Sequence, residues 1–170
     1  MAELLLDAAY ATLRYFYDEG FGYAALMNTR PQTLGYSLAD SPVGMAAFYY
    51  DKFAEWSDSG GDPEEVFTWD EILDAISFYW LTNTGASSSR SYWDAARGDG
   101  GPFNAVEITK VRVAVTVFPG EIYPAPKSWA ERSFHKLIYW NTVNRGGHFA
   151  AWEQPAIFTQ EIREAFKSLR

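Results

Sequence analysis

Two short stretches late in the chain have the pattern of β-strands. VRVAVTVF (111–118) alternates valine with other residues, and KLIYWNTV (136–143) is also rich in β-branched and aromatic residues. A short helical stretch around SWAERSF lies between them, which predicts a βαβ unit with parallel strands. Two parallel strands cannot bury both faces of a sheet. We therefore expect these strands to pair with another polypeptide or to be one part of a larger fold.

Helical patterns flank the predicted strands. Residues 1–20 have apolar positions at helical spacing, and Ser41 followed by Pro42 predicts the start of a helix to about Trp56. Thr68 and Glu71 have the spacing of a capping box for a helix to about Thr82. Further helices are expected at 86–97, opened by a serine cap, and at 155–170, with one apolar face. The polar segment 57–65 lacks the spacing of a calcium loop and is predicted to be a solvated loop.

Composition excludes several classes of protein. The 170 residues suit one globular domain, and the net charge of −8, with 14 scattered Lys and Arg residues, argues against nucleic-acid binding. No apolar run is long enough to span a membrane, and the first 20 residues resemble neither a secretion signal nor an anchor. Because the chain has no cysteine, cytoplasmic localisation is the default expectation. The 18% aromatic content fits either core packing or an aromatic-lined pocket.

An acid and a histidine follow the two predicted strands. Glu121 comes shortly after the first strand and His148 shortly after the second. Parallel strands end at the same edge of a sheet, where α/β proteins bind ligands, so these side chains can approach each other. A carboxylate beside a histidine is the base half of a nucleophilic triad. The alternative is a solvated Glu and a loop His bonded to backbone, and the turn at Gly146 and Gly147 fits both interpretations.

No nucleophile accompanies this pair. The sequence has no G-x-S-x-G motif, and we interpret Ser87, Ser88 and Ser89 as helix caps. His135 has no acid partner in view and is interpreted as structural. With two distant histidines, we expect no metal ligation and no other cofactor.

Four segments in order carry a family resemblance: GYAALMNTRPQTLGYSLADSPVGMAAF, FYWLTNTGASSSRSYWD, FPGEIYPAPKSWAER and RGGHFAAWEQP. From about Phe21 to its end, the chain resembles the C-terminal half of epoxide hydrolases of the microsomal and juvenile-hormone type, which are α/β-hydrolases with a helical lid. The resemblance implies an α/β fold in which residues 1–104 form the lid and lid-to-core helices. Residues 105–170 would then form the C-terminal βαβα part of the core.

The resemblance also implies roles for four residues. His148 would be the general base, Glu121 its acid partner, and Tyr23 and Tyr92 the lid tyrosines that hold the epoxide oxygen. In such enzymes a carboxylate opens the ring and forms an ester, phenols stabilise the leaving alkoxide, and histidine activates the water that hydrolyses the ester. Without the family, packing would be the simpler interpretation of Tyr23 and Tyr92.

The resemblance leaves part of the machinery unassigned. In the family the nucleophilic aspartate and the oxyanion-hole loop lie upstream of the matched segments, and neither Asp40 nor Asp99 has a matching context. We therefore expect a small apolar epoxide as substrate and either a complementary N-terminal half or self-association. The chain alone should show little or no turnover. The alternatives are a non-catalytic binding or scaffold protein with the same fold and, less well matched to paired tyrosines, a different α/β-hydrolase reaction.

Overall fold

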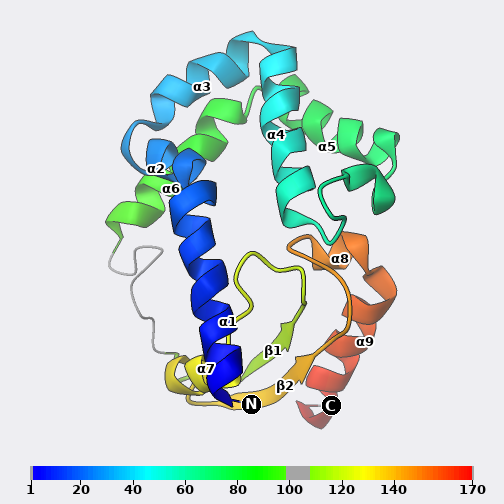
Figure 1. Cartoon of the computed structure of the whole chain (residues 1–170). Helices are drawn as coiled ribbons and strands as arrows, with labels where there is room; N and C mark the ends of the chain where they lie inside the picture. The colour runs from blue at the N-terminus through cyan, green and yellow to red at the C-terminus, as the bar shows by residue number, and fades with distance from the viewer. Residues whose placement is uncertain (1, 99–107, 170) are drawn as a thin grey trace.

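The computed structural model describes residues 2–98 and 108–169 (Figure 1). The helices before the sheet are α1 (Ala2–Tyr15), α2 (Gly22–Thr29), α3 (Pro31–Asp40), α4 (Pro42–Trp56), α5 (Trp69–Leu81) and α6 (Gly85–Arg97). They are followed by β1 (Val113–Val117), α7 (Lys127–Ser133), β2 (Leu137–Thr142), α8 (Ala150–Glu153) and α9 (Pro155–Ala165). Short helical turns of other types lie at Phe16–Gly20, Pro63–Glu65 and Lys167–Leu169. The order of helices followed by strand, helix, strand and helix is as predicted.

Figure 1 shows two ends of the molecule. Helices α2, α3, α4, α5 and α6 gather at one end, and β1, β2, α7 and α9 lie at the other. Helix α1 runs between the two ends and reaches α7, where the rings of Tyr10 and Trp129 are 5.4 Å apart.

Two helix starts follow directly from local sequence. The hydroxyl of Ser41 accepts a hydrogen bond from the Gly44 N–H at 3.0 Å, and α4 begins with proline as predicted. At the start of α5, the Glu71 N–H donates to Thr68 Oγ1 at 3.3 Å while the Thr68 N–H donates to Glu71 Oε2 at 2.8 Å. Both predicted caps are therefore confirmed.

The start of α6 differs from the prediction. The residue that precedes the helix is Thr84, which makes no side-chain cap, and Ser87–Ser89 lie inside the first turns. Their hydroxyls donate to the carbonyl oxygens of Thr84 and Gly85. The predicted serine cap is therefore wrong. Gly85, the first residue of α6, lies so close to α3 that a Cβ on it would be 2.8 Å from the Cβ of Leu38.

The hydrophobic core lies in the helical part of the chain. Its buried members come from α3, α4, α5 and the turn before α5, and they are Leu38, Met45, Phe53, Phe67, Ile72 and Ile76. The strands are less covered, since every residue of β1 is only partly buried. A parallel sheet is normally covered on both faces. The described residues therefore cover this sheet less completely than is usual.

The two strands pair in parallel, as the βαβ pattern predicted. Val115 lies opposite Trp140, and α7 connects the strands. Helix α9 packs on one face through Glu161, whose buried carboxylate accepts hydrogen bonds from the side chains of Thr116, Tyr139 and Asn141. This contact fixes α9 to both strands.

The C-terminal helix is less buried than its apolar pattern suggested. In α9 the buried residues are Glu161 and Ala165, whereas Ile162 is 44% exposed and Phe166, which follows the helix, is 39% exposed. The carboxylate of Glu161 has taken the central position against the sheet, so part of the apolar face remains open to solvent.

The predicted boundary between 1–104 and 105–170 falls in segment 99–107, and it lies outside the described residues. Across 2–98 and 108–169, no helix combines the length and apolar character that crossing a lipid bilayer requires.

Candidate active site

The pairing of the strands continues beyond their ends and brings Glu121 next to His148. Gly120 and Gly147 form an isolated parallel bridge, and the Gly120 N–H donates to the Gly146 carbonyl oxygen at 2.9 Å. The next residue on one segment is Glu121, and the next on the other is His148. The predicted approach of the two side chains at one edge of the sheet is therefore confirmed, and its cause is the parallel register.

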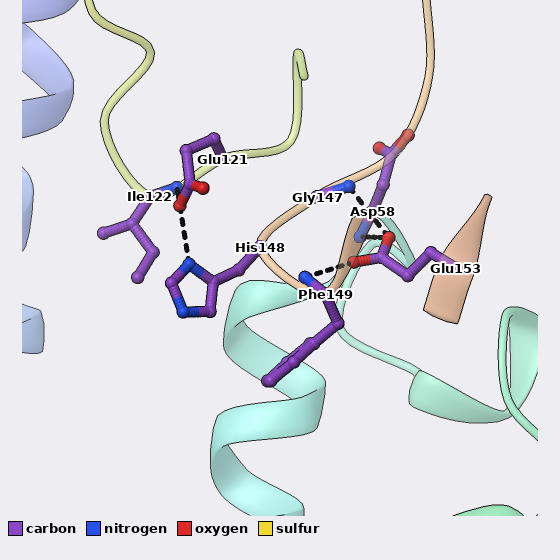
Figure 2. Close-up of polar contacts among 7 residues, drawn as sticks. All are labelled: Asp58, Glu121, Ile122, Gly147, His148, Phe149 and Glu153. Carbon is purple, nitrogen blue, oxygen red and sulfur yellow. Dashed lines mark hydrogen bonds and ion pairs between the residues drawn. The ribbon is translucent and has the colours of Figure 1, made fainter. Parts of the chain in front are cut away.

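Glu121 and His148 form a direct contact. His148 Nδ1 lies 2.8 Å from Glu121 Oε1 (Figure 2), and the same oxygen accepts the Ile122 N–H at 2.7 Å. A carboxylate oxygen only accepts hydrogen bonds, so Nδ1 carries the proton and Nε2 is left as the basic nitrogen. This is the tautomer that a general base requires.

The charges of this pair stabilise each other. The hydrogen bond to Glu121 raises the pKa of His148, although burial opposes the shift. Burial alone would raise the pKa of Glu121, but the hydrogen bonds from His148 and from the Ile122 N–H outweigh burial and lower it. The two side chains are 40% and 35% exposed, so solvent screens part of this attraction.

The glycine pair before His148 has a steric reason. Gly146 has a φ of 105°, a conformation that side chains disfavour. A Cβ on Gly147 would lie 2.7 Å from both the Asp58 backbone nitrogen and the Trp56 carbonyl oxygen. The two glycines therefore permit the turn and the close approach of two backbones.

Glu153 organises the loop that carries His148. Its Oε2 accepts the N–H groups of Asp58 and Gly147, and its Oε1 accepts the N–H of Phe149, each at 2.9 Å (Figure 2). The residue is 8% exposed, so these bonds form in a largely dehydrated place. The sequence did not indicate this role, because one of the bonded groups, the N–H of Asp58, lies 95 positions away in the chain.

The segment after α4 contributes to the same loop. The Gly146 N–H donates to Asp58 Oδ2 at 2.8 Å, and the His148 N–H donates to the Trp56 carbonyl oxygen at 2.9 Å. Asp58 is exposed, but Ser57 beside it is buried and bonded to the Phe53 carbonyl oxygen. The prediction of a solvated loop at 57–65 is therefore wrong at its start, where the chain meets the His148 loop.

The two predicted tyrosines also meet. Tyr23 on α2 and Tyr92 on α6 have ring centroids 5.8 Å apart in an edge-to-face arrangement. Burial, followed by the neighbouring Tyr92 phenol, raises the pKa of Tyr23. The Tyr23 phenol consequently keeps its proton at neutral pH and can act as a hydrogen-bond donor.

Trp56 connects the tyrosines with the histidine. Its ring centroid lies 5.2 Å from that of Tyr23 and 5.3 Å from that of His148. Beside it is a mostly aromatic cavity of about 400 Å³, whose wall includes Tyr23, Tyr92, Phe48, Tyr49, Phe53, Trp56, Phe149 and Trp152. His148 is outside this wall and contacts it through Trp56 and Phe149. An aromatic-lined pocket was one of the two explanations for the high aromatic content, and both explanations hold.

Lys52 is the charged side chain in the cavity wall, and its significance was missed in the sequence. Its ammonium lies 4.9 Å from the Tyr23 ring centroid and 5.2 Å from that of Trp56. Burial alone would lower the pKa of Lys52, but hydrogen bonds to Asp51 and Glu55 outweigh burial and raise it. The charge is thus balanced by two carboxylates rather than available for an anionic ligand.

Of the remaining candidates, Ser88 lines the cavity, whereas Ser89 and His135 do not. Ser89 is fully buried, and its hydroxyl donates to the Gly85 carbonyl oxygen. The His135 backbone N–H, two residues before β2, donates to the Ile108 carbonyl oxygen. Within the described ranges, no group of three or more acidic or histidine side chains could hold a metal ion.

Comparison with known proteins adds a family to this geometry. A putative epoxide hydrolase of Stigmatella aurantiaca is 54% identical over 95% of the chain, and epoxide hydrolase 1 of Sus scrofa is 37% identical over 94%. The crystal structure of juvenile hormone epoxide hydrolase from the silkworm Bombyx mori superposes with a TM-score of 0.80, at 27% identity over 96% of the chain. No protein-family model matches the chain. The chain spans 36% and 37% of the two sequence relatives and 39% of the solved structure.

Fold and site together define the helical lid segment and the C-terminal part of an α/β-hydrolase fold, as predicted. More particularly, the chain is homologous to a segment of epoxide hydrolases of the microsomal and juvenile-hormone type. The family resemblance seen in the sequence is therefore confirmed.

Proposed function

We propose that this chain supplies part of the active site of an epoxide hydrolase, which adds water to an epoxide to give a vicinal diol. The observation that carries the proposal is the contact of 2.8 Å between His148 Nδ1 and Glu121 Oε1, beside a cavity that contains Tyr23 and Tyr92. The homology to epoxide hydrolases supports the same assignment.

The tyrosines act on the ring oxygen. When a carboxylate attacks an epoxide carbon, the carbon–oxygen bond breaks and negative charge develops on the oxygen. Two phenols aimed at that oxygen stabilise the charge and donate the proton that the alkoxide needs. Tyr23 and Tyr92 suit this role because they are adjacent, and the raised pKa keeps the Tyr23 phenol protonated until the alkoxide forms.

His148 acts on the ester that results. Its Nε2 accepts a proton from water as the water oxygen attacks the ester carbonyl. When the acyl–oxygen bond breaks, the imidazolium gives this proton to the leaving diol oxygen, and the second proton of the water passes from the regenerated carboxyl group to the tyrosine that protonated the first alkoxide. The imidazolium is stabilised by the carboxylate of Glu121. The contact at Nδ1 also prevents the ring from turning its protonated nitrogen toward water.

The nucleophile is expected from a complementary segment. Among the described residues no aspartate follows either strand, and Asp40 is the last residue of α3, where it has no strand–turn–helix context. Asp99 lies outside the described residues. We propose that a polypeptide equivalent to the remaining part of the relatives supplies the nucleophilic aspartate and the oxyanion donors. The partly buried strands offer the surface on which that segment pairs.

The aromatic cavity suggests the chemical class of the substrate. Its wall is mostly apolar, and the ammonium of Lys52 is already neutralised by Asp51 and Glu55. A neutral, small apolar epoxide fits these surroundings better than an anionic one.

A chimeric enzyme tests the proposal. This chain would replace the matching segment of the Stigmatella aurantiaca relative. Hydrolysis of a neutral aryl epoxide would then be measured as the amount of diol formed. Turnover by the chimera, together with its loss in His148→Gln, supports the proposal. The matched control is Tyr36→Phe, which changes an exposed tyrosine outside the cavity and should leave turnover unchanged. A folded chimera without turnover would instead favour a non-catalytic binding or scaffold role.

A further inference from the structure

The backbone on both sides of His148 is bonded to one carboxylate. The N–H of Gly147, which precedes the histidine, and the N–H of Phe149, which follows it, both donate to Glu153 at 2.9 Å. A third N–H, from Asp58 after α4, donates to the same side chain. Figure 2 shows the imidazole on one side of this loop and the Glu153 carboxylate on the other. Glu153 therefore holds the backbone next to the histidine, while Glu121 bonds the imidazole ring on the opposite side of the loop.

We propose that Glu153 is a positioning residue for the general base, because its buried carboxylate fixes the backbone on both sides of His148 and so directs the imidazole toward Glu121. The inference rests on the proposed role of His148 in catalysis. It assigns no contact with substrate to Glu153, which acts through the loop.

A carboxylate is the side chain that this place requires. Both oxygens of Glu153 receive N–H groups, and Oε2 receives two. A glutamine of the same shape would present an NH₂ donor to at least one N–H donor, and that polar group would be left buried without a partner. An aspartate would keep the charge but would be one methylene too short to reach all three groups.

The charge of Glu153 also acts on the ring. The charged groups around His148 come from three elements, namely Glu121 after β1, Asp58 after α4 and Glu153 in α8. The pKa of His148 is raised first by the hydrogen bond to Glu121, against burial, and further by the negative charges of Glu121 and Glu153. Removal of the Glu153 carboxylate should therefore lower the pKa of His148, because its negative charge is lost and because the imidazole is no longer directed toward Glu121. A residue that only stabilised the fold elsewhere would not change this pKa.

The test uses the 170-residue chain and two measurements that do not require turnover. NMR of ¹³C-labelled imidazoles follows the titration of His148, with His135 as the internal reference, because the chain contains two histidines. Amide hydrogen exchange follows the N–H groups of Gly147 and Phe149. In Glu153→Gln we expect a lower pKa for His148, no change for His135, and exchange at the two amides at least about ten times faster.

A second variant and a matched control complete the design. Glu153→Asp keeps the charge, so we expect faster exchange at Gly147 and Phe149 with a smaller fall in the pKa of His148, and this variant supplies the measurement if Glu153→Gln does not fold. The control is Glu161→Gln, an equally buried glutamate whose partners are side chains of the sheet. It should leave the exchange at both amides and the pKa of His148 unchanged.

Two outcomes overturn the inference. One is exchange at Gly147 and Phe149 that stays within about twofold of the parent chain in both Glu153 variants. The other is a change in the pKa of His148 that is equally large in Glu161→Gln. Neither measurement depends on turnover. A chimera without activity would therefore refute the proposed function, whereas the effect of Glu153 on the His148 loop would still be decided by the exchange and the titration.

Discussion

Replacement of Gly147 by alanine should loosen the His148 loop, and the structure indicates by how much. The added Cβ would lie 2.7 Å from the Asp58 nitrogen, 2.7 Å from the Trp56 carbonyl oxygen and 3.0 Å from Glu153 Oε1. The first two are backbone atoms, which cannot rotate away as a side chain can. The loop must therefore withdraw from the end of α4.

The withdrawal has two costs. Overpacking of this kind costs about 1–3 kcal/mol, and hydrogen bonds contribute about 1 kcal/mol each, or about 1.5–3 kcal/mol when one partner is charged. The bonds at risk are His148 N–H to Trp56 and Gly147 N–H to Glu153, both 2.9 Å long. Because one movement relieves the clash and breaks the bonds, the two costs overlap. We expect a local loss of about 3 kcal/mol, which corresponds to amide exchange about 100 times faster.

Amide hydrogen exchange, read by mass spectrometry on peptides that cover 145–149, measures this local loss of stability. Because the measurement is confined to these peptides, self-association through other parts of the chain does not affect it. The control is Gly22→Ala, since a Cβ there meets nothing within 4 Å. Gly22→Ala should leave exchange at 145–149 unchanged. Exchange in Gly147→Ala within about threefold of the parent chain would show that the close approach does not fix the loop.

Three further predictions concern the proposed chemistry and its electrostatics. In the chimera, Tyr23→Phe and Tyr92→Phe should each lower kcat/KM by about 10²-fold, as loss of an oxyanion donor does, whereas Tyr36→Phe should not; equal values for all three variants would contradict the tyrosine roles. His148→Gln should accumulate an ester on the nucleophilic aspartate, visible as a covalent adduct by mass spectrometry, and full turnover by this variant would show that another base acts. Because folding raises the pKa of His148, this group stabilises the fold fully at pH values below its unfolded pKa and loses that effect as the pH rises through its folded pKa. Because folding lowers the pKa of Glu121, this group stabilises the fold at pH values above its unfolded pKa. Glu121→Gln should therefore lower the melting temperature more at about pH 5.5 than at about pH 9, and a pH-independent difference would refute this coupling.

Local patterns in the sequence predicted the parts of the fold that local interactions determine. The cap at Ser41 and the capping box of Thr68 and Glu71 depend on atoms three residues apart, so the sequence is enough to recognise them. The parallel strands, the approach of Glu121 to His148 and the missing cover of the sheet followed from general rules of α/β topology. Helices α2 and α3 were not predicted as separate helices, although the family resemblance covered their residues.

The support of the site could not be predicted because it depends on contacts between distant segments. Glu153 bonds to a residue 95 positions away, and the bond between Asp58 and Gly146 spans 88 positions. No local spacing records such pairs, and Asp58 looked like an ordinary solvated acid. The tyrosine roles came from the family alone, since two tyrosines among eleven carry no signal of their own.

The double attachment of Trp56 determines how the cavity can open. Its ring lies against Tyr23, while its carbonyl oxygen holds the His148 N–H at 2.9 Å, so one residue at the end of α4 touches both sides of the site. The two sides can separate at this point only if Trp56 loses either its ring contact with Tyr23 or the hydrogen bond that its carbonyl oxygen accepts from His148. The first is a contact between rings and the second a backbone hydrogen bond, so Trp56 stays with the His148 loop more readily than with the tyrosines.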